Sequence, residues 1–158
     1  MSTGKEPPSI HDMEPGMDFD PAMAAKFMNK RGHGSYIGLR YHAHGSNWFE
    51  LALPWRAELA GMAASGILAS GPIISLMDNA TSMAVWTLVG SFIPHATLDL
   101  RVDYMRAAVP GRTVIGHGEC YKLTRTVAFV RGIAHDGDID DPVAHVTGMF
   151  MATHGAYK

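Results

Sequence analysis

The spacing of apolar and polar positions predicts one long central helix with strands on both sides of it. Residues 73–88 contain no Gly or Pro and are apolar on nearly every side, a pattern typical of a buried helix. Pro72 precedes this segment and suits the first turn of a helix. A shorter helix is expected to begin at Asp20 and Pro21, since Asp caps helices and Pro fits the first position, and to stop by Gly32.

Strand patterns fill most of the remaining chain. Residues 36–43 and 48–54 are two apolar runs around a Gly/Asn turn, which predicts a hairpin. Four more strands are expected after the long helix, over residues 97–105, 113–123, 126–135 and 143–153. The first of these four alternates strictly, so its polar residues should share one face: Thr97, Asp99, Arg101 and Asp103. The expected fold class is α+β, with one curved antiparallel sheet wrapped around one long buried helix.

Composition narrows the class of protein. The 158 residues predict a single domain over residues 20–158, after a polar, flexible tail over residues 1–19. The formal net charge is −2 and no basic run occurs, so nucleic acid is not an expected partner. The chain shows neither a signal-peptide pattern nor an uninterrupted apolar run of about 18 residues, which favours a cytoplasmic protein outside membranes. The single cysteine, Cys120, cannot form an intrachain disulfide and is interpreted as an unreactive thiol.

Asp78 is the unusual residue of the long helix, because it lies among apolar neighbours. A buried charge costs several kcal/mol unless it is paired, and unpaired buried carboxylates are good candidates for catalysis. Ser75 and Ser82 lie three residues before and four after it, so they share its face of the helix. The alternative is a structural Asp that bonds its neighbours or pairs with an Arg.

Gly71 marks the start of the same helix, where free backbone N–H groups and the helix dipole can bind an anion. A developing oxyanion is such an anion. The alternative is a plain helix-start glycine. Seven helical residues turn by about 700° and rise by about 10 Å, so Gly71 and Asp78 share a face but cannot touch one carbonyl. A two-fold dimer that brings Gly71 of one subunit towards Asp78 of the other would solve this.

The segment LASGPIISLMDNATSMA, residues 68–84, resembles the signature of phenylacetate-degradation-type hotdog thioesterases. Residues 53–61, 97–108 and 126–130 also resemble this family, and the resemblance covers about residues 35–153. It implies a hotdog fold, an acyl-CoA substrate, no cofactor, and a homodimer or a dimer-of-dimers tetramer. The expected activity is hydrolysis of the thioester to a free acid and CoA.

The resemblance also implies roles for individual residues. Asp78 would activate water or attack the thioester, Ser70 and Gly71 would supply backbone N–H donors, and Thr97 would assist with its hydroxyl. Two positions depart from the family pattern: its histidine falls on Ala69, and an upstream Asn or Gln falls near Ala63. These losses remove side-chain polar groups but leave the carboxylate and the backbone donors.

Substrate contacts and competing functions complete the expectations. The candidate substrate contacts are Ser82 on the face of Asp78 and three basic residues near turns, for the CoA phosphates: Arg106, Lys122 and Arg125. The first competing function is a non-catalytic acyl-CoA or lipid-binding protein, which the two alanines motivate. The second is a hydratase, which Asp140 and His145 motivate. His42 and His44 share a strand face but are too few for a metal site, so no metal is expected.

Overall fold

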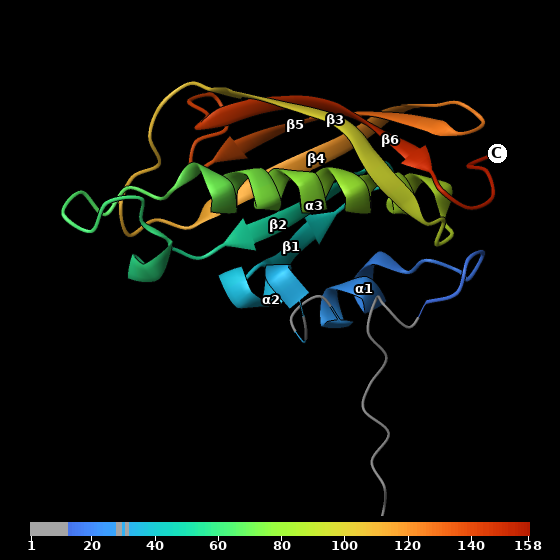
Figure 1. The fold of residues 1–158 in the computed structure, drawn as a ribbon, viewed down its shortest axis with the longest axis horizontal. Coiled ribbons are helices and arrows are strands. Elements are labelled where there is room, and N and C mark those ends of the chain that lie inside the picture. Colours follow the sequence, from blue (N-terminus) through green and yellow to red (C-terminus); the bar gives the residue numbers. More distant parts are fainter. Residues whose placement is uncertain (1–12, 28–29, 31) are drawn as a thin grey trace, which may run out of the picture.

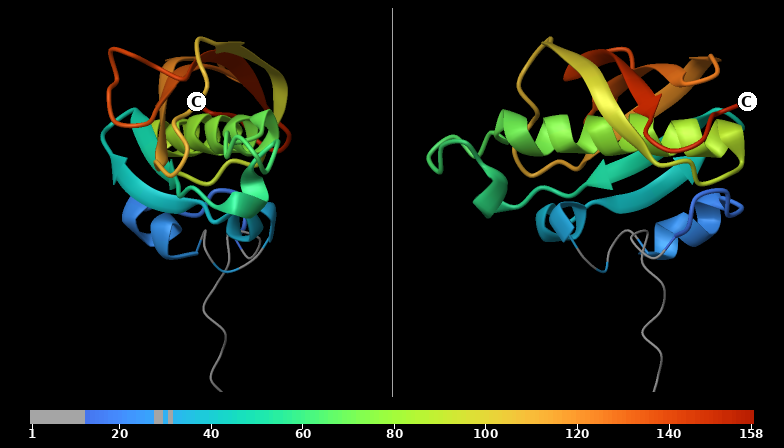
Figure 2. Two further views of the ribbon diagram at one scale, coloured as in Figure 1. Left: turned by 90° about the vertical axis from the view of Figure 1, so that its left-hand side faces the viewer. Right: turned by 45° about the vertical axis from the view of Figure 1, so that its right-hand side comes forward.

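The computed structural model describes residues 13–27, 30 and 32–158. The elements follow in the order α1 (Pro21–Phe27), α2 (Gly32–Ile37), β1 (Arg40–His44), β2 (Trp48–Leu53), a 3₁₀ turn (Ala57–Leu59), α3 (Ser70–Val89), β3 (His95–Tyr104), β4 (Val114–Leu123), β5 (Val127–His135) and β6 (Ala144–Ala152). The six strands form one antiparallel sheet in the order β1-β2-β4-β5-β6-β3. The sheet curves around α3, which runs through its concave side (Figures 1 and 2). The expected α+β hotdog architecture is therefore confirmed.

Helix α3 forms the centre of the core. It begins at Ser70, slightly before the expected start, and ends where Gly90 takes a positive φ of 73° and its N–H donates to the carbonyl of Trp86. Its sheet-facing residues are fully or nearly buried: Ile73, Leu76, Met77, Ala80, Thr81, Met83, Ala84, Val85 and Trp86. The other side is open, and even Ile74 is 41% exposed. The helix is thus not apolar and buried all round, because the sheet covers only its concave side.

Glycines on β4 let α3 approach the sheet closely. A Cβ at Gly118 would stand 2.6 Å from backbone atoms of Ala80 and Thr81, and one at Gly116 would stand 2.7 Å from the Leu76 side chain. Side chains at these two positions would push the helix away from the sheet. The depth of α3 in the fold is therefore fixed by β4.

Strand β3 is the open edge of the sheet and carries a β-bulge. Its register with β6 shifts between Thr97 and Asp99, so the alternation slips by one residue. Leu100 and Val102 pack on the core beside α3, and Thr97 also reaches α3. The expectation that Thr97 shares a face with Asp99 is therefore wrong, because a bulge adds a residue that no alternating pattern reveals.

The start of the chain differs from expectation in two ways. Asp20 caps α1 as predicted, since its Oδ1 accepts from the N–H of Ala22 at 2.9 Å. However, residues 36–37 belong to α2, and β1 begins only at Arg40, after Gly38 turns the chain with a φ of 83°. The end of α1 towards residue 28 lies at the limit of the described residues.

The segment before α1 packs against the domain from Met13 onward. Phe19 is buried, its N–H donates to the Gly90 carbonyl, and the N–H of Gly16 donates to the Phe92 carbonyl. The tail boundary expected at residue 19 is therefore too late, because these contacts join residues 13–19 to the end of α3. Residues 1–12 lie outside the described part of the chain.

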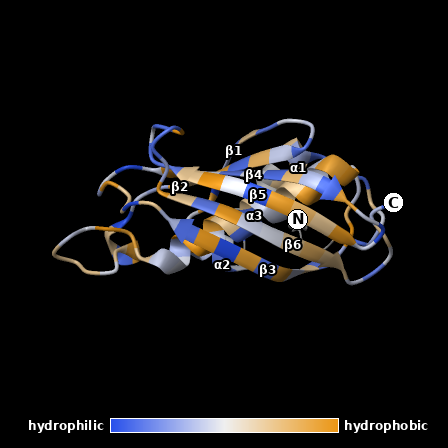
Figure 3. Cartoon of the chain, turned by 90° about the horizontal axis from the view of Figure 1, so that it is seen from above, coloured by the Kyte–Doolittle hydropathy of each residue, from blue (hydrophilic) through white to orange (hydrophobic). Residues whose placement is uncertain are grey.

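Hydrophilic and hydrophobic residues are mixed along the strands of the sheet, as Figure 3 shows from above. His117 contacts the Glu50 carboxylate at 2.8 Å, and Arg131 contacts that of Glu119 at the same distance. These pairs place polar side chains among the apolar ones on this part of the sheet. None of the described helices is long and apolar enough to cross a membrane.

Candidate active site

Asp78 lies on α3, half-buried, on the side of the helix that faces β3. The Thr97 hydroxyl donates to its Oδ1 at 2.8 Å. The bulge in β3 turns Thr97 towards the helix, and bulges often re-aim side chains beside active sites. Two of the expected catalytic residues therefore meet, although 19 positions separate them in the sequence. A carboxylate held by one hydroxyl at an accessible position is arranged to accept a proton from water.

The first turn of α3 places Ser70 and Gly71 at the exposed start of the helix. Ala69 precedes them and its side chain makes no capping bond, so backbone N–H groups of the first turn are left for another acceptor. A Cβ on Gly71 would meet nothing within 4 Å, and Gly71 has no positive φ. Neither packing nor backbone conformation within this chain requires a glycine there, which leaves close approach by another molecule as the physical reason.

Three hydrogen-bonding contacts connect α3 to β3, which run side by side in opposite directions. Ser82 contacts His95, Asp78 contacts Thr97, and Ser70 contacts Tyr104. These residues form the polar stripe of α3, which we define as Ser70, Gly71, Ser75, Asp78 and Ser82. The stripe also touches α2, where His33 lies 2.9 Å from the Ser75 hydroxyl. Asp78 and Ser82 thus both face β3, as expected, whereas Ser75 contacts α2.

His95 is a residue of this region that sequence reasoning missed. Its Nε2 lies 2.7 Å from the Ser82 hydroxyl, and its ring stacks on Trp86 with a centroid distance of 4.6 Å. Burial lowers its pKa to about 4, so the imidazole is neutral at pH 7. The available signal was its position two residues before Thr97, which places both on one face of a strand.

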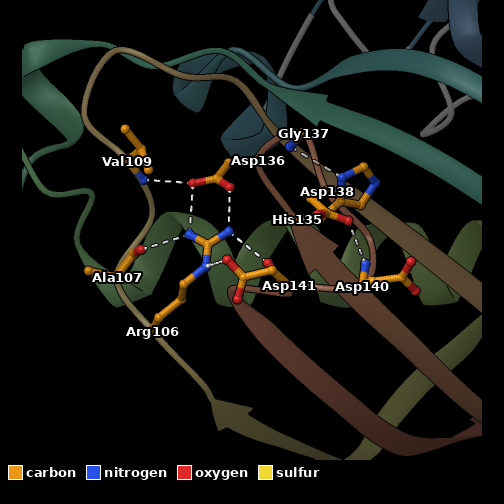
Figure 4. A network of polar contacts seen from close by, with 9 residues as sticks. All are labelled: Arg106, Ala107, Val109, His135, Asp136, Gly137, Asp138, Asp140 and Asp141. Carbon is orange, nitrogen blue, oxygen red and sulfur yellow. Dashed lines mark hydrogen bonds and ion pairs between the residues drawn. The ribbon is translucent and has the colours of Figure 1, made fainter.

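The remaining expected substrate contacts are dispersed. Arg106 binds Asp136 through both terminal nitrogens, at 3.0 and 2.6 Å, and its Nε lies 2.9 Å from a carboxylate oxygen of Asp141 (Figure 4). The Arg106 guanidinium holds the pKa of Asp136 down at about 2. The expectation that Arg106 meets CoA phosphates is therefore corrected, since its guanidinium is engaged by acids within the chain.

Lys122 and Arg125 are exposed and lie near the other end of the helix from Ser70. Arg125 is in the turn between β4 and β5, and its carbonyl accepts from the N–H of Tyr157, whose ring faces His95. Within one chain these cations are thus separated from the start of α3 by the length of the helix. The structure brings neither of them to Asp78.

The two residues behind the hydratase alternative do not gather at the polar stripe. Asp140 is in the exposed loop before β6, and His145 is exposed on β6 opposite Ile133, on the outer side of the sheet. Cys120 is buried, and burial raises the pKa of its thiol to about 11, as expected for an unreactive cysteine. Among the described residues, no three His, Cys, Asp or Glu side chains are grouped to hold a metal ion.

Comparison with known proteins decides the family. The family model of the thioesterase superfamily matches residues 65–143, half of the chain. The chain belongs to the thioesterase superfamily. A Pseudomonas aeruginosa protein of known structure is 37% identical, with 75% of this chain and 88% of that chain covered and a TM-score of 0.69. A search of curated proteins found no match.

Other solved structures share the fold at lower identity. A thioesterase from Haemophilus influenzae is 16% identical, with a TM-score of 0.73 over 88% of this chain and 94% of that chain. The Escherichia coli PaaI protein of the phenylacetic acid degradation operon is 13% identical, with a TM-score of 0.67 over 77% and 84%. These likenesses confirm the hotdog fold, and superfamily membership supports thioester hydrolysis as the general activity.

Proposed function

We propose that this thioesterase-superfamily protein hydrolyses acyl-CoA thioesters in the manner of the phenylacetate-degradation type. The observation that carries the proposal is the 2.8 Å bond from Thr97 to the Asp78 carboxylate on the accessible stripe of α3. The Thr97 hydroxyl orients this carboxylate on an accessible face, where an attacking water can reach it.

The proposed reaction uses two groups of this chain. Asp78 takes a proton from water as the water oxygen attacks the thioester carbon, and the tetrahedral intermediate then expels CoA as its thiol on return of that proton. Direct attack by the carboxylate, followed by hydrolysis of the anhydride, is the other route open to the same residue. Backbone N–H groups at Ser70 and Gly71 stabilise the oxyanion in either route.

We infer that the two groups come from different subunits of a homodimer. Gly71 and Asp78 are seven residues apart on α3, a rise of about 10 Å, while one reacting carbonyl needs both within about 3 Å. A two-fold axis would bring the helix start of one subunit to the carboxylate of the other. β3 supports this assembly, since it is a sheet edge with Leu98 half exposed and is available to pair with a second copy.

The test of the proposed function is Asp78→Asn on a panel of CoA esters with a free-thiol assay. The swap is nearly isosteric, so the fold should persist while kcat falls by about 100- to 10,000-fold. Asp103→Asn is the matched control, because Asp103 is an exposed acid on β3 that pairs with Arg101. An Asp78→Asn enzyme with wild-type kcat would make Asp78 structural. A wild-type protein that binds CoA esters without hydrolysing them would favour the non-catalytic alternative.

A further inference from the structure

Tyr104 ends β3 directly beside the start of α3. Its hydroxyl donates to the Ser70 carbonyl oxygen at 3.2 Å. Partial burial raises the pKa of this phenol above its ordinary value of 10.0, so it remains a hydrogen-bond donor at neutral pH. Ser70 and Tyr104 also line one pocket of about 150 Å³, together with Leu68 and Ile73. The phenol therefore reaches the part of α3 that the proposed function assigns to the oxyanion.

The Ser70 carbonyl is not an isolated acceptor, because it shares a peptide unit with the N–H of Gly71. The peptide bond is planar and trans, so the direction of this C=O fixes the direction of that N–H. Ser70 is the first residue of α3, so its carbonyl already belongs to the helix ladder, whereas side-chain packing around Gly71 adds nothing, since a Cβ there would contact nothing within 4 Å. The Tyr104 hydroxyl therefore adds a second hydrogen bond to this carbonyl, from outside the helix, at an end where helices fray, and so further restrains how the Gly71 N–H points.

The end of β3, which carries Tyr104, is held in place by its neighbours. The N–H of Met105 donates to the Val143 carbonyl at 2.9 Å, which ties the end of β3 to β6. Arg106 follows, and its ion pair with Asp136 also engages the N–H of Val109, which donates to the same carboxylate at 2.7 Å (Figure 4). Asp136 is 4% exposed, so this anchor is shielded from solvent. Tyr104 therefore extends from a fixed point of the sheet.

We propose that Tyr104 is a positioning residue for the oxyanion donor: its hydroxyl orients the Ser70–Gly71 peptide so that the Gly71 N–H meets the thioester carbonyl. The proposal rests on the proposed function, in which this N–H stabilises the oxyanion. The contacts among Arg106, Asp136 and Val109 would then support catalysis indirectly, because they fix the end of β3 that carries the phenol. Tyr104 does not touch the reacting atoms and acts only through the backbone.

The kinetic test is Tyr104→Phe, which removes one hydroxyl and keeps the ring. We expect kcat to fall by about 10-fold with KM nearly unchanged, less than the ~100- to 1000-fold loss on removing an oxyanion donor itself. Tyr121→Phe is the matched control, because Tyr121 is half exposed on β4, where the guanidinium of Arg131 lies over its ring. Thermal unfolding of each variant separates this loss from a change in stability.

A spectroscopic test reports the hydrogen bond at the carbonyl without turnover. Asp78→Asn would hold the best ester of the panel, labelled with ¹³C at the thioester carbonyl, and the infrared C=O stretch would be recorded. Adding Tyr104→Phe should move this stretch to higher wavenumber, because a misdirected N–H polarises the carbonyl less. Tyr121→Phe in the same background should leave the stretch unchanged.

The outcomes distinguish the two proposals. If wild type hydrolyses the ester through Asp78 but Tyr104→Phe changes neither kcat nor the carbonyl stretch, the role of Tyr104 is overturned and the proposed function stands. If Asp78→Asn matches wild type, the proposed function fails and takes the role of Tyr104 with it. A loss of kcat with an unchanged stretch also rejects positioning, because it shows that the phenol acts elsewhere.

Discussion

Asp78 and Gly71 are two residues of α3 that core packing does not explain. One is a half-buried acid that receives a hydroxyl bond from a neighbouring strand, and the other is a glycine with open space around it. Ser70 contributes to the proposed site only through its backbone: its carbonyl accepts a hydrogen bond from Tyr104, and its side chain has no assigned role. These differences separate backbone from side-chain roles and can be tested at single positions.

Replacing Gly71 by Val should reduce kcat/KM by about 100-fold, because its β-branched side chain blocks the approach of a carbonyl to the backbone N–H. Space for the added Cβ means that this variant should still fold. Ser70→Ala is the matched comparison and should stay within about twofold of wild type, since its N–H survives. Both are measured on the best ester of the panel. If Ser70→Ala loses activity and Gly71→Val retains it, the Ser70 hydroxyl rather than the backbone N–H stabilises the oxyanion.

His95 predicts how stability depends on pH. Its pKa is about 4 in the folded protein against an ordinary 6.5, so between these values only the unfolded chain binds the proton. The contribution of His95 to the free energy of unfolding should therefore be fully present above pH 6.5. It should fall by up to about 3 kcal/mol as the pH drops towards 4. Urea unfolding from pH 4 to 7 measures this slope. His95→Gln should flatten it, whereas His145→Gln, an exposed control, should not; equal slopes in all three proteins would contradict the prediction.

At the scale of elements, the apolar periodicity predicted α3 and all four later strands closely. The pattern is strong because one face of each strand packs against the helix. It could not reveal the bulge beside Thr97, since one extra residue leaves the alternating letters intact. It also read residues 36–37 as strand, because a short apolar run fits α2 equally well.

The candidate site was less predictable, because its contacts join elements that are distant in the sequence. The sequence pattern indicated Asp78, and the resemblance added Thr97. Arg106 and Asp136 are 30 positions apart in the sequence, so no local residue pattern predicts their pairing. His95 was missed for a similar reason, because its bond to Ser82 depends on how β3 crosses the helix.

Gly118 on β4 tests the coupling between sheet and helix. Gly118→Ala should cost about 1–3 kcal/mol, because its Cβ would overlap the backbone of α3 and lift the helix. The shift should also lower kcat, since Asp78 moves relative to Thr97. Gly34→Ala is the control, because a Cβ there makes only an ordinary contact at 3.5 Å with Leu39. Equal unfolding midpoints for the two variants would show that the fold tolerates the added volume.

At the scale of the whole molecule, a site shared between subunits makes a prediction that a site within one chain does not. Asp78→Asn and Gly71→Val subunits are each inactive alone. A mixed dimer has one site with both changes and one with neither. Refolding the two variants together at equal amounts should restore about a quarter of wild-type activity, because half of the dimers are mixed and each has one intact site. Light scattering of the wild-type protein should show at least a dimer. If the refolded mixture is as inactive as the two variants alone, the whole site lies within one chain.

The strand order carries a consequence for how the chain is made. β6 lies between β5 and β3, so β3 has no hydrogen-bonding neighbour until residues 144–152 have been synthesised. At about 5–20 residues per second, the ribosome needs some seconds to make the intervening segment. During that time α3 can already pack on β2 and β4, but β3 lacks its partner strand on the nascent chain. The segment that completes the proposed site, Thr97 beside Asp78, therefore settles only after β6 has left the ribosome, and newly made chains should depend on protection from aggregation during this interval.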